Sequence, residues 1–277
     1  MWLPPASRVS DASAWRVRSQ IGIVLLPTNI DFVAPLVGYR QKKNGDLTSN
    51  PNISDASMKS SVDISRHILH ALSGSAPRSV PFAENSGALF ERALREWLMG
   101  QLSRFARERV WHYADTTIDA FDQYRHLLDL ERLIEADETD LLATSLGRDY
   151  RIKPDVVIGQ RGEDGRLHLH AAVSCKWTLR SDRAQNVRQE ARTMIKERRG
   201  RLPHIVAVTM EPMPTRIASL ARGTGDVDAV YHAAYSALRE AIVDEHLGGE
   251  QQREVLDELI QQRRLLDIAM LPATLTL

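Results

Sequence analysis

The feature that most constrains the fold is a pair of β-rich runs joined by a short turn. The runs are "RIKPDVVIGQ" at 151–160 and "RLHLHAAVSCKW" at 166–177, and "RGEDG" lies between them. An Asp-Gly pair between two such runs is a strong signal for a tight turn. The sequence therefore predicts a β-hairpin.

The hairpin register predicts which side chains meet at the far end of the two strands. If the Asp-Gly pair centres the turn, Asp155 lies opposite Ser174. Side chains alternate along a strand, so Lys176 shares the face of Ser174 and lies diagonal to Asp155, within reach of a long side chain. Cys175 then points the other way, into the core. An ordinary strand-end ion pair between Asp155 and Lys176 is one interpretation of this arrangement.

The rest of the chain predicts one α/β domain with helical flanks. Residues 40–62 are rich in Ser, Asn and Asp and predict a loop. Short apolar runs predict further strands at 204–210 and 227–233. Apolar spacing and cap residues predict helices over 63–73, from Asn85 or Ser86 onward, within 118–146, and over 181–199, 233–246 and 249–268.

Composition sets the broad class of protein. A chain of 277 residues with 43% hydrophobic residues can bury a large core. Its longest apolar run, 21–26, is far shorter than the roughly 20 residues of a membrane span, and the first residues lack a signal-peptide pattern. The one cysteine excludes a disulfide framework. We therefore expect a cytoplasmic protein with no membrane partner.

Charge is balanced overall but not locally. The formal net charge is zero, yet 176–201 holds nine basic residues against three acidic ones. Such a patch is typical of surfaces that bind phosphate backbones. A solvated helix face is the alternative interpretation.

An aspartate and a lysine at the ends of paired strands indicate metal-assisted hydrolysis of a phosphodiester. The carboxylate would hold Mg²⁺, which prefers oxygen ligands, and the ammonium would add a positive contact to the phosphate. A second carboxylate is normally required, and Ser174 occupies the place where the strand could supply it. Glu190 lies two helical turns after Arg183, on roughly the same face, and is the candidate substitute. In the alternative interpretation Glu190 is simply solvated.

Arg180, Asp182 and Arg183 form a fork of charges just after the second strand. Arginine fits the two acceptors of guanine in the major groove, and a carboxylate can accept from the amino group of cytosine. The fork therefore suits a half-site of guanines and cytosines. Alternatively, Ser181 or Asp182 is the N-cap of the following helix.

Four motifs in order resemble a known family. "KPD" at 153–155, "SCK" at 174–176, "RSDR" at 180–183 and Glu190 resemble the Type II restriction endonucleases that read sites centred on CCGG. The resemblance runs from about 82 to 232. It implies a PD-(D/E)XK nuclease core, with a mixed central sheet flanked by helices and helical additions at both ends. We expect a single domain over 1–277, with a helical C-terminal part at 233–277.

The resemblance also implies roles for individual residues. Asp155 would be a direct ligand of Mg²⁺, and Lys176 would polarise the phosphate. Glu190 would stand in for the acid missing at Ser174. Glu91, in "SGALFER", matches an additional acid of this branch. The implied metal site comprises Asp155, Cys175 and Glu190.

DNA recognition is implied in the same way. Arg180, Asp182 and Arg183 would read the CCGG core. Arg216, in "EPMPTR", matches a residue that contacts the outer base pair, and Asp55, in "NISDAS", matches a minor-groove contact. Glu84 departs from the family pattern, which has a neutral amide in this DNA-facing loop.

The resulting hypothesis is a restriction endonuclease that cleaves double-stranded DNA at GCCGGC after the first G. It would act as a homotetramer, a dimer of dimers, beside a cognate DNA methyltransferase. Two alternatives stay open. One is a PD-(D/E)XK endonuclease for another CCGG-centred palindrome, such as one with outer A·T pairs. The other is a CCGG-binding protein that has lost catalysis.

Overall fold

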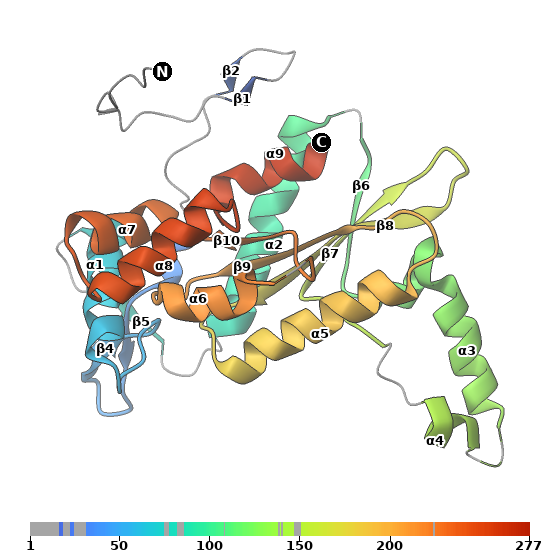
Figure 1. Ribbon diagram of the computed structural model, residues 1–277, viewed down its shortest axis with the longest axis horizontal. Helices are drawn as coiled ribbons and strands as arrows, with labels where there is room; N and C mark the ends of the chain where they lie inside the picture. Colours follow the sequence, from blue (N-terminus) through green and yellow to red (C-terminus); the bar gives the residue numbers. More distant parts are fainter. Residues whose placement is uncertain are drawn as a thin grey trace, which may run out of the picture.

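The computed structural model has a six-stranded mixed sheet at its centre (Figure 1). It describes residues 17–18, 23–24, 32–74, 78–81, 86–107, 109–137, 139, 141–146, 151–223 and 225–277. The strand order is β11-β10-β9-β8-β7-β6. The strands are β6 (Trp111–Ala114), β7 (Val156–Arg161), β8 (Leu167–Lys176), β9 (His204–Thr209), β10 (Ala229–His232) and β11 (Leu265–Asp267).

The predicted hairpin is formed by β7 and β8, which pair antiparallel. Val156 pairs with Val173, so the predicted opposition of Asp155 and Ser174 follows one residue further on. A bulge between Ile158 and Gly159 shifts the register only toward the turn. Gly165 takes the positive φ of 75° that this turn requires. The register at the functional end of the hairpin is therefore the predicted one.

The other half of the sheet is parallel. β8, β9, β10 and β11 run in the same direction and are joined by helical crossovers. The crossovers contain α5 (Ser181–Glu197), α6 (Pro214–Ala221), α7 (Tyr235–Arg239) with a π-helical turn at Glu240–Asp244, and α8 (Glu250–Gln261). The carboxyl ends of parallel strands meet at one edge, where α/β proteins usually place their sites. Lys176 ends β8 at this edge, and Glu211 follows β9 there.

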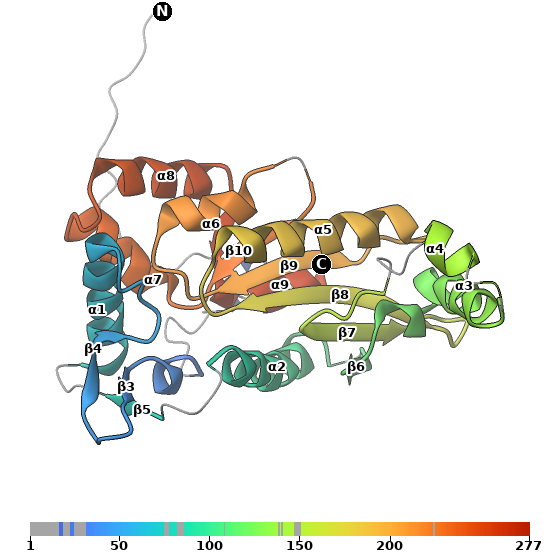
Figure 2. The ribbon, with the colours of Figure 1, turned by 90° about the horizontal axis from the view of Figure 1, so that it is seen from below.

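Helices cover both faces of the sheet. Figure 2 shows α2 (Ser86–Phe105) on one face and α5, α6 and α8 on the other. Helix α5 buries one side chain every three or four residues, which is the spacing of a single helix face: Ala184, Val187, Ala191 and Met194. Basic side chains occupy much of the rest of its surface, as the solvated-face interpretation requires.

The predicted loop at 40–62 is partly wrong. It contains the hairpin of β3 (Tyr39–Gln41) and β4 (Leu47–Pro51), and α1 (Lys59–Ser73) begins within it. The strands are short and mostly polar because one side faces solvent, which hides them from an apolar pattern. Their turn nevertheless carries a hairpin signal, Asn44-Gly45, with Gly45 at a φ of 88°. β5 (Ser79–Val80) pairs parallel with β3, and β1 (Val17–Arg18) pairs with β2 (Ile23–Val24).

The helical C-terminal part also needs a correction. Helix α8 ends at Gln261, and Arg263 takes a φ of 54°, which turns the chain back toward the sheet. β11 then pairs parallel with β10, and α9 (Leu271–Thr276) follows. The expected helix over 249–268 is therefore interrupted by a strand, because the edge of β10 offers backbone hydrogen bonds. The central sheet extends beyond the expected core limit at 232.

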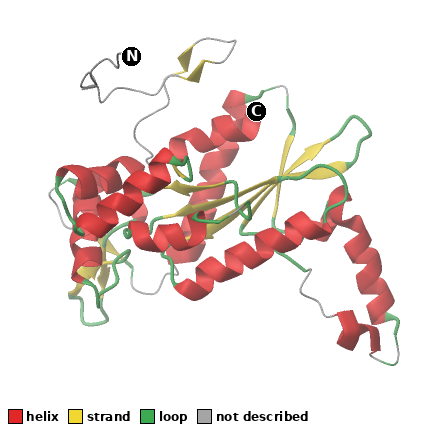
Figure 3. Cartoon of the chain, in the orientation of Figure 1, coloured by secondary structure: helices red, strands yellow, loops and turns green. Residues whose placement is uncertain are grey.

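Segment 118–146 forms two helices, as predicted, after two 3-10 turns. They are α3 (Arg125–Glu135) and α4 (Leu141–Leu146). Both lie at the opposite end of the molecule from α1 (Figure 1). Figure 3 shows the strands at the centre with helices around them. The predicted α/β class, a mixed sheet flanked by helices, is thus confirmed.

The core surrounds β8, whose middle residues are buried on both faces. Ala171 and Val173 on one face are fully buried, and Ala172 and Ser174 on the other face are 2% and 6% exposed. Beyond the strand, Trp177 packs edge-on against Phe90 of α2 with ring centroids 5.3 Å apart. Its indole N–H donates to the carbonyl of Asn52 at 3.1 Å. Within the described part of the chain, no helix combines the length and apolarity needed to cross a membrane.

Candidate active site

The ends of β7 and β8 bring Asp155 and Lys176 together. Lys176 Nζ lies 2.6 Å from Asp155 Oδ2, and the backbone N–H of Cys175 donates to the same oxygen at 2.6 Å. The side chain of Asp155 is 27% exposed and that of Lys176 is 22% exposed. Pro154 precedes Asp155 and restricts Lys153 to extended backbone. The hairpin register thus places a carboxylate and an ammonium in contact at the mouth of a cleft.

A second carboxylate comes from α2, on the opposite face of the sheet from α5. Glu91 accepts from Arg95 Nη2 at 2.8 Å, and the same nitrogen lies 3.4 Å from the backbone oxygen of Asp155. Burial raises the pKa of Glu91, and repulsion from Asp155 raises it further. Glu91 therefore belongs to the same electrostatic site as Asp155.

The third carboxylate is Glu190 of α5. It follows the buried Val187 by three residues and is itself partly buried. Burial raises the pKa of Glu190; Lys176 lowers it and Asp155 raises it. Glu190 therefore feels both members of the strand-end ion pair, although it is distant from both in sequence.

These groups line one cleft of about 1080 Å³, called here the strand-end cleft. Strands, α2, α5 and the β3–β4 hairpin all contribute to its walls. Most of its charged and hydrogen-bonding side chains are Arg40, Asn50, Asn52, Glu91, Asp155, Lys176, Arg180, Arg183, Asn186 and Glu190. The structure thus brings together Asp155, Lys176 and Glu190, as the sequence predicts, and adds Glu91, as the family resemblance implies.

The charged fork lies at the start of α5. Arg180 is the N-cap residue and makes no side-chain cap, so neither Ser181 nor Asp182 is the N-cap. Arg183 donates to the carbonyl of Thr178 at 3.1 Å. Arg180 and Arg183 line the cleft, whereas Asp182 is exposed and is not among its lining residues. Two of the three fork residues therefore face the cleft in this structure.

Ser174 and Cys175 are both largely buried, although Cys175 is among the residues that line the cleft. Ser174 is 6% exposed and is not among the residues that line the cleft. Cys175 is 7% exposed, and burial raises the pKa of its thiol well above the usual range, with a further contribution from Asp155. A neutral buried thiol is a poor ligand for a hard cation. The backbone N–H of Cys175 orients Asp155, and a metal contact of Cys175 stays a prediction.

The donor set of the cleft fits a divalent cation. Three carboxylates converge beside one lysine, and the pKa values of Glu91 and Glu190 are raised, partly because of Asp155. A cation that accepts oxygen ligands would compensate the lost hydration that chiefly raises these two pKa values. Among the residues that the structure describes, no three acidic, histidine or cysteine side chains form a ready-made metal centre. The acids are gathered but not preassembled.

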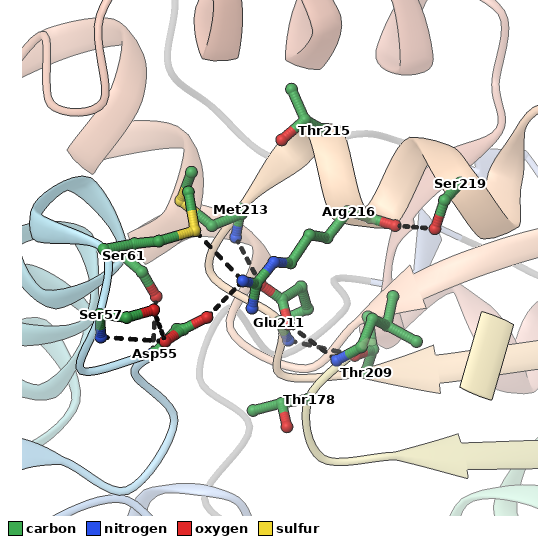
Figure 4. A network of polar contacts seen from close by, with 12 residues as sticks. Asp55, Ser57, Ser61, Thr178, Thr209, Glu211, Met213, Thr215, Arg216 and Ser219 are labelled. Atoms are coloured by element: carbon green, nitrogen blue, oxygen red, sulfur yellow. Dashed lines mark hydrogen bonds and ion pairs between the residues drawn. The ribbon is translucent and has the colours of Figure 1, made fainter. Parts of the chain in front are cut away.

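Asp55 and Arg216 lie beside the cleft and contact each other (Figure 4). Arg216 Nη2 donates to Asp55 Oδ2, and Asp55 also accepts from the hydroxyl of Ser57 at 2.6 Å. The pKa of Asp55 is lowered, first by Ser57 and then by Arg216. Neither Asp55 nor Arg216 is among the residues that line the cleft. Two residues predicted as separate DNA contacts thus form one ion pair.

Sequence reasoning missed several polar residues of the cleft, among them Asn186 and Arg40. Asn186 lies between Arg183 and Glu190 on the same stripe of α5, and that helical spacing could have identified it. Arg40 comes from β3, and its Nη2 lies 3.4 Å from Ser86 Oγ. No sequence signal linked Arg40 to the cleft. Glu84, where the chain departs from the family pattern, lies outside the described residues.

An α/β sheet whose paired strands end in an acid and a lysine, with further acids from flanking helices, defines a nuclease of the PD-(D/E)XK type. The comparisons agree. The model of the "NgoMIV restriction enzyme" family matches residues 37–166 and 160–277. The Type II restriction enzyme NgoMIV of Neisseria gonorrhoeae is 33% identical over 266 residues, covering 84% of this chain and 91% of that protein. The chain therefore belongs to the NgoMIV restriction enzyme family and is a Type II site-specific deoxyribonuclease.

A more distant likeness comes from a solved structure, a pre-specific complex of the restriction endonuclease BsaWI with DNA. It has 15% sequence identity and a TM-score of 0.31, and it covers 65% of this chain and 64% of that one. A likeness this remote carries no further conclusion. Restriction endonucleases of the family's type generally use divalent metal ions, in agreement with the acids of the cleft.

Proposed function

We propose that the protein cleaves double-stranded DNA at GCCGGC, after the first G, by Mg²⁺-dependent hydrolysis that leaves 5′ overhangs. One observation carries this proposal. Asp155, Lys176, Glu91 and Glu190 line the same cleft as the two arginines at the start of α5. Catalytic groups and groups suited to guanine therefore face one bound duplex.

Within this proposal the strand ends perform the chemistry. A bound Mg²⁺ would supply positive charge to the scissile phosphate and lower the pKa of an attacking water. Asp155 is proposed as its direct ligand. Lys176, 2.6 Å from Asp155 Oδ2, would turn its ammonium toward a phosphate oxygen and stabilise the charge that grows there.

The flanking acids complete the proposed site. Ser174 occupies the strand position where an acid is expected. Glu190 would take the role of that acid, because α5 places its carboxylate in the same cleft as the Asp155–Lys176 pair. Glu91 would be the additional acid, oriented by Arg95. Cys175, also predicted at the metal, holds Asp155 in place through its backbone N–H. In the unprotonated state these acids would favour cation binding.

The residues that follow β8 and β9, together with Asp55, are proposed to recognise the DNA sequence. Arg180, Asp182 and Arg183 would read the CCGG core, with the arginines donating to guanine and the carboxylate accepting from cytosine. Arg216 would contact the outer base pair, and Asp55 the minor groove. The basic residues that follow the fork, up to 201, would engage the phosphate backbone.

A palindromic site matches a two-fold dimer, because each subunit then reads one half-site. We extend the proposal to a dimer of dimers in the cytoplasm, and to a cognate DNA methyltransferase that protects the host genome. Analytical ultracentrifugation tests the assembly, since a tetramer has four times the chain mass of 31.2 kDa. A species of dimer mass at working concentration contradicts the tetramer.

Digestion of a fully sequenced plasmid tests the specificity. With the protein and Mg²⁺, we expect every cut end to map to GCCGGC after its first G. Ends at other CCGG-centred palindromes would establish the alternative endonuclease. Sequence-specific binding with no cleavage in any divalent metal would establish the inactive binding protein. The same plasmid after cytosine methylation of GCCGGC should resist cleavage.

A further inference from the structure

A fully buried carboxylate, Glu211, lies between the two DNA-reading segments. It follows β9 and has no exposed surface. Its Oε2 accepts from the backbone N–H of Leu179 at 2.7 Å, and its Oε1 accepts from that of Met213 at 3.2 Å. A buried charge is retained only where such bonds compensate its lost hydration. Each of its two oxygens therefore holds a different loop.

The first of these loops joins the catalytic strand to the fork. Leu179 lies between Lys176, the last residue of β8, and Arg180, the N-cap of α5. Arg183 also donates to this loop, at the carbonyl of Thr178. The position of this loop therefore determines where Arg180 and Arg183, the two arginines that line the cleft, are placed. Glu211 fixes it through Leu179.

The second loop leads into α6 and Arg216. Met213 is the N-cap residue of α6, and Arg216 lies in its first turn. Arg216 Nη1 is 3.9 Å from Glu211 Oε1, while its Nη2 donates to Asp55 (Figure 4). A continuous chain of contacts thus runs from Leu179 through Glu211 and Arg216 to Asp55, between segments that are distant in sequence.

The charges around Glu211 make this connection sensitive to protonation. Burial raises the pKa of Glu211 to about 7, although Leu179, Arg216 and Met213 oppose the shift and Asp55 adds to it. The ring of His232 lies 3.1 Å from the backbone oxygen of Glu211. Burial lowers the pKa of His232 to about 4, so this ring stays neutral between pH 6 and 8.

We propose that Glu211 is a positioning residue for specificity, which couples the arginine fork that reads the inner bases to Arg216, the residue that contacts the outer base pair and is ion-paired with Asp55. This inference rests on the proposed function for the identity of those bases. Glu211 does not touch the DNA; it acts by fixing the relative position of two groups that do. Without it, the fork and Arg216 would move independently.

Glu211→Gln tests the coupling. An amide has one acceptor oxygen, so it cannot accept from both Leu179 and Met213, and it carries no charge for Arg216. Asp267→Asn is the matched control: Asp267 is also a largely buried carboxylate with a raised pKa that accepts from a backbone N–H, that of Ala269. It ends β11, the edge strand, and β10 separates it from β9, which Glu211 follows.

Two quantities are measured for the full-length variants. The first is discrimination, the ratio of cleavage rates for a GCCGGC duplex over an ACCGGT duplex in Mg²⁺. We expect Glu211→Gln to reduce this ratio about tenfold, as for loss of a charged hydrogen bond, and Asp267→Asn to leave it unchanged. The second is hydrogen exchange of the Leu179 amide without DNA, which should become about tenfold faster only in Glu211→Gln.

The wild type provides a further test, which needs no variant. Lowering the pH from 8 to 6 protonates Glu211 and should reduce the discrimination ratio, while Glu211→Gln should show no such change. Titration of Glu91 and Glu190 affects both duplexes equally and cancels in the ratio. A ratio that is constant over this range in the wild type overturns the proposal, even if Glu211→Gln fails to fold.

The proposed function can fail separately from this inference. If plasmid digestion shows no CCGG-dependent cleavage, the proposed function fails, and Leu179 exchange still decides whether Glu211 holds the loop. If cleavage occurs at GCCGGC but Glu211→Gln keeps its discrimination and slow Leu179 exchange, the coupling is wrong and the proposed function stands.

Discussion

Two clusters of acids and bases lie at the same edge of the sheet, yet they are built in opposite ways. In the strand-end cleft, burial raises the pKa of Glu91 and Glu190, Asp155 adds to this shift, and Lys176 opposes it. Around Arg216, hydrogen bonds lower the pKa of Asp55. Gathered carboxylates that have lost hydration without gaining a full set of hydrogen bonds indicate a place for a cation, whereas a matched ion pair indicates a structural or recognition role.

Replacing Lys176 by alanine should have the largest effect. The cleft would lose the ammonium that stabilises charge on the phosphate, so we expect the cleavage rate to fall about 10²–10³-fold. Binding to a GCCGGC duplex in Ca²⁺ should change little, because the fork is untouched. Gel-shift assays and single-turnover cleavage measure the two quantities.

Lys196→Ala is the matched control for Lys176. Lys196 lies in the last turn of α5, is 82% exposed and pairs with Glu197. The control should cleave at the wild-type rate when the enzyme saturates the DNA. Full activity of Lys176→Ala, or equal losses in both variants, would remove Lys176 from the proposed chemistry.

Glu190→Gln should reduce the affinity for a divalent cation by at least about tenfold. A metal that binds only the folded protein raises the unfolding temperature, and this rise should be lost in the variant. In the wild type, the affinity for the metal should weaken as the pH falls, because Glu91 and Glu190 must lose their protons to bind the cation. Thermal unfolding in a series of Mg²⁺ concentrations measures both.

Without metal, the stability of the fold should decrease as the pH rises, whereas the metal affinity increases. A carboxyl whose folded pKa is raised destabilises the fold as the pH rises above its ordinary value of about 4.3. Glu190→Gln should therefore be more stable than the wild type at pH 8 without metal, and the difference should disappear near pH 4. Glu197→Gln, on the same helix, is the control for the metal titration. Its unfolding temperature should rise with Mg²⁺ as much as that of the wild type.

Arg183→Ala should weaken binding to CCGG duplexes by about 1–3 kcal/mol and relax the preference for guanine. Arg192→Ala is the control, because Arg192 lies further along α5, is 57% exposed and pairs with Asp226. We expect the control to affect all sequences equally. Fluorescence anisotropy with cognate and substituted duplexes distinguishes the two results; equal losses on all sequences for Arg183→Ala would exclude base reading.

Asp55→Asn should have the smallest effect on the fold, a loss of about 0.2–1 kcal/mol in unfolding free energy at pH 7, since the ion pair is partly exposed. The folded pKa of Asp55 is lowered, so its contribution exists above the ordinary pKa and is lost as the pH falls. Urea unfolding at pH 7 and pH 3 should show the difference shrinking with acid. A difference that grows at pH 3 would contradict the lowered pKa.

Local signals predicted the catalytic edge of the molecule well. The Asp-Gly turn set the register that places Asp155 against Lys176, and the apolar spacing of α5 put Arg183 and Glu190 on one stripe. Both arguments use short-range geometry, in which strand and helix periods fix the facing side chains. This is why the convergence of these residues could be predicted without coordinates.

Long-range contacts could not be predicted in this way. The ion pair between Asp55 and Arg216 joins residues 161 positions apart, and no local pattern specifies such a contact. β11 was hidden because Leu265 and Leu266 continue the apolar spacing of α8. Glu211 gave no signal at all, since its role depends on a loop before α5 that only tertiary packing brings to it.

The buried indole of Trp177 provides an intrinsic fluorescence signal at the cleft. This ring lies next to Lys176 in the chain, contacts the helix that carries Glu91, and donates to the loop that precedes Asp55. Its emission should therefore change when any of these walls shifts. With the other four tryptophans (Trp2, Trp15, Trp97 and Trp111) replaced by phenylalanine, stopped-flow fluorescence could time the binding of DNA at the cleft without a label.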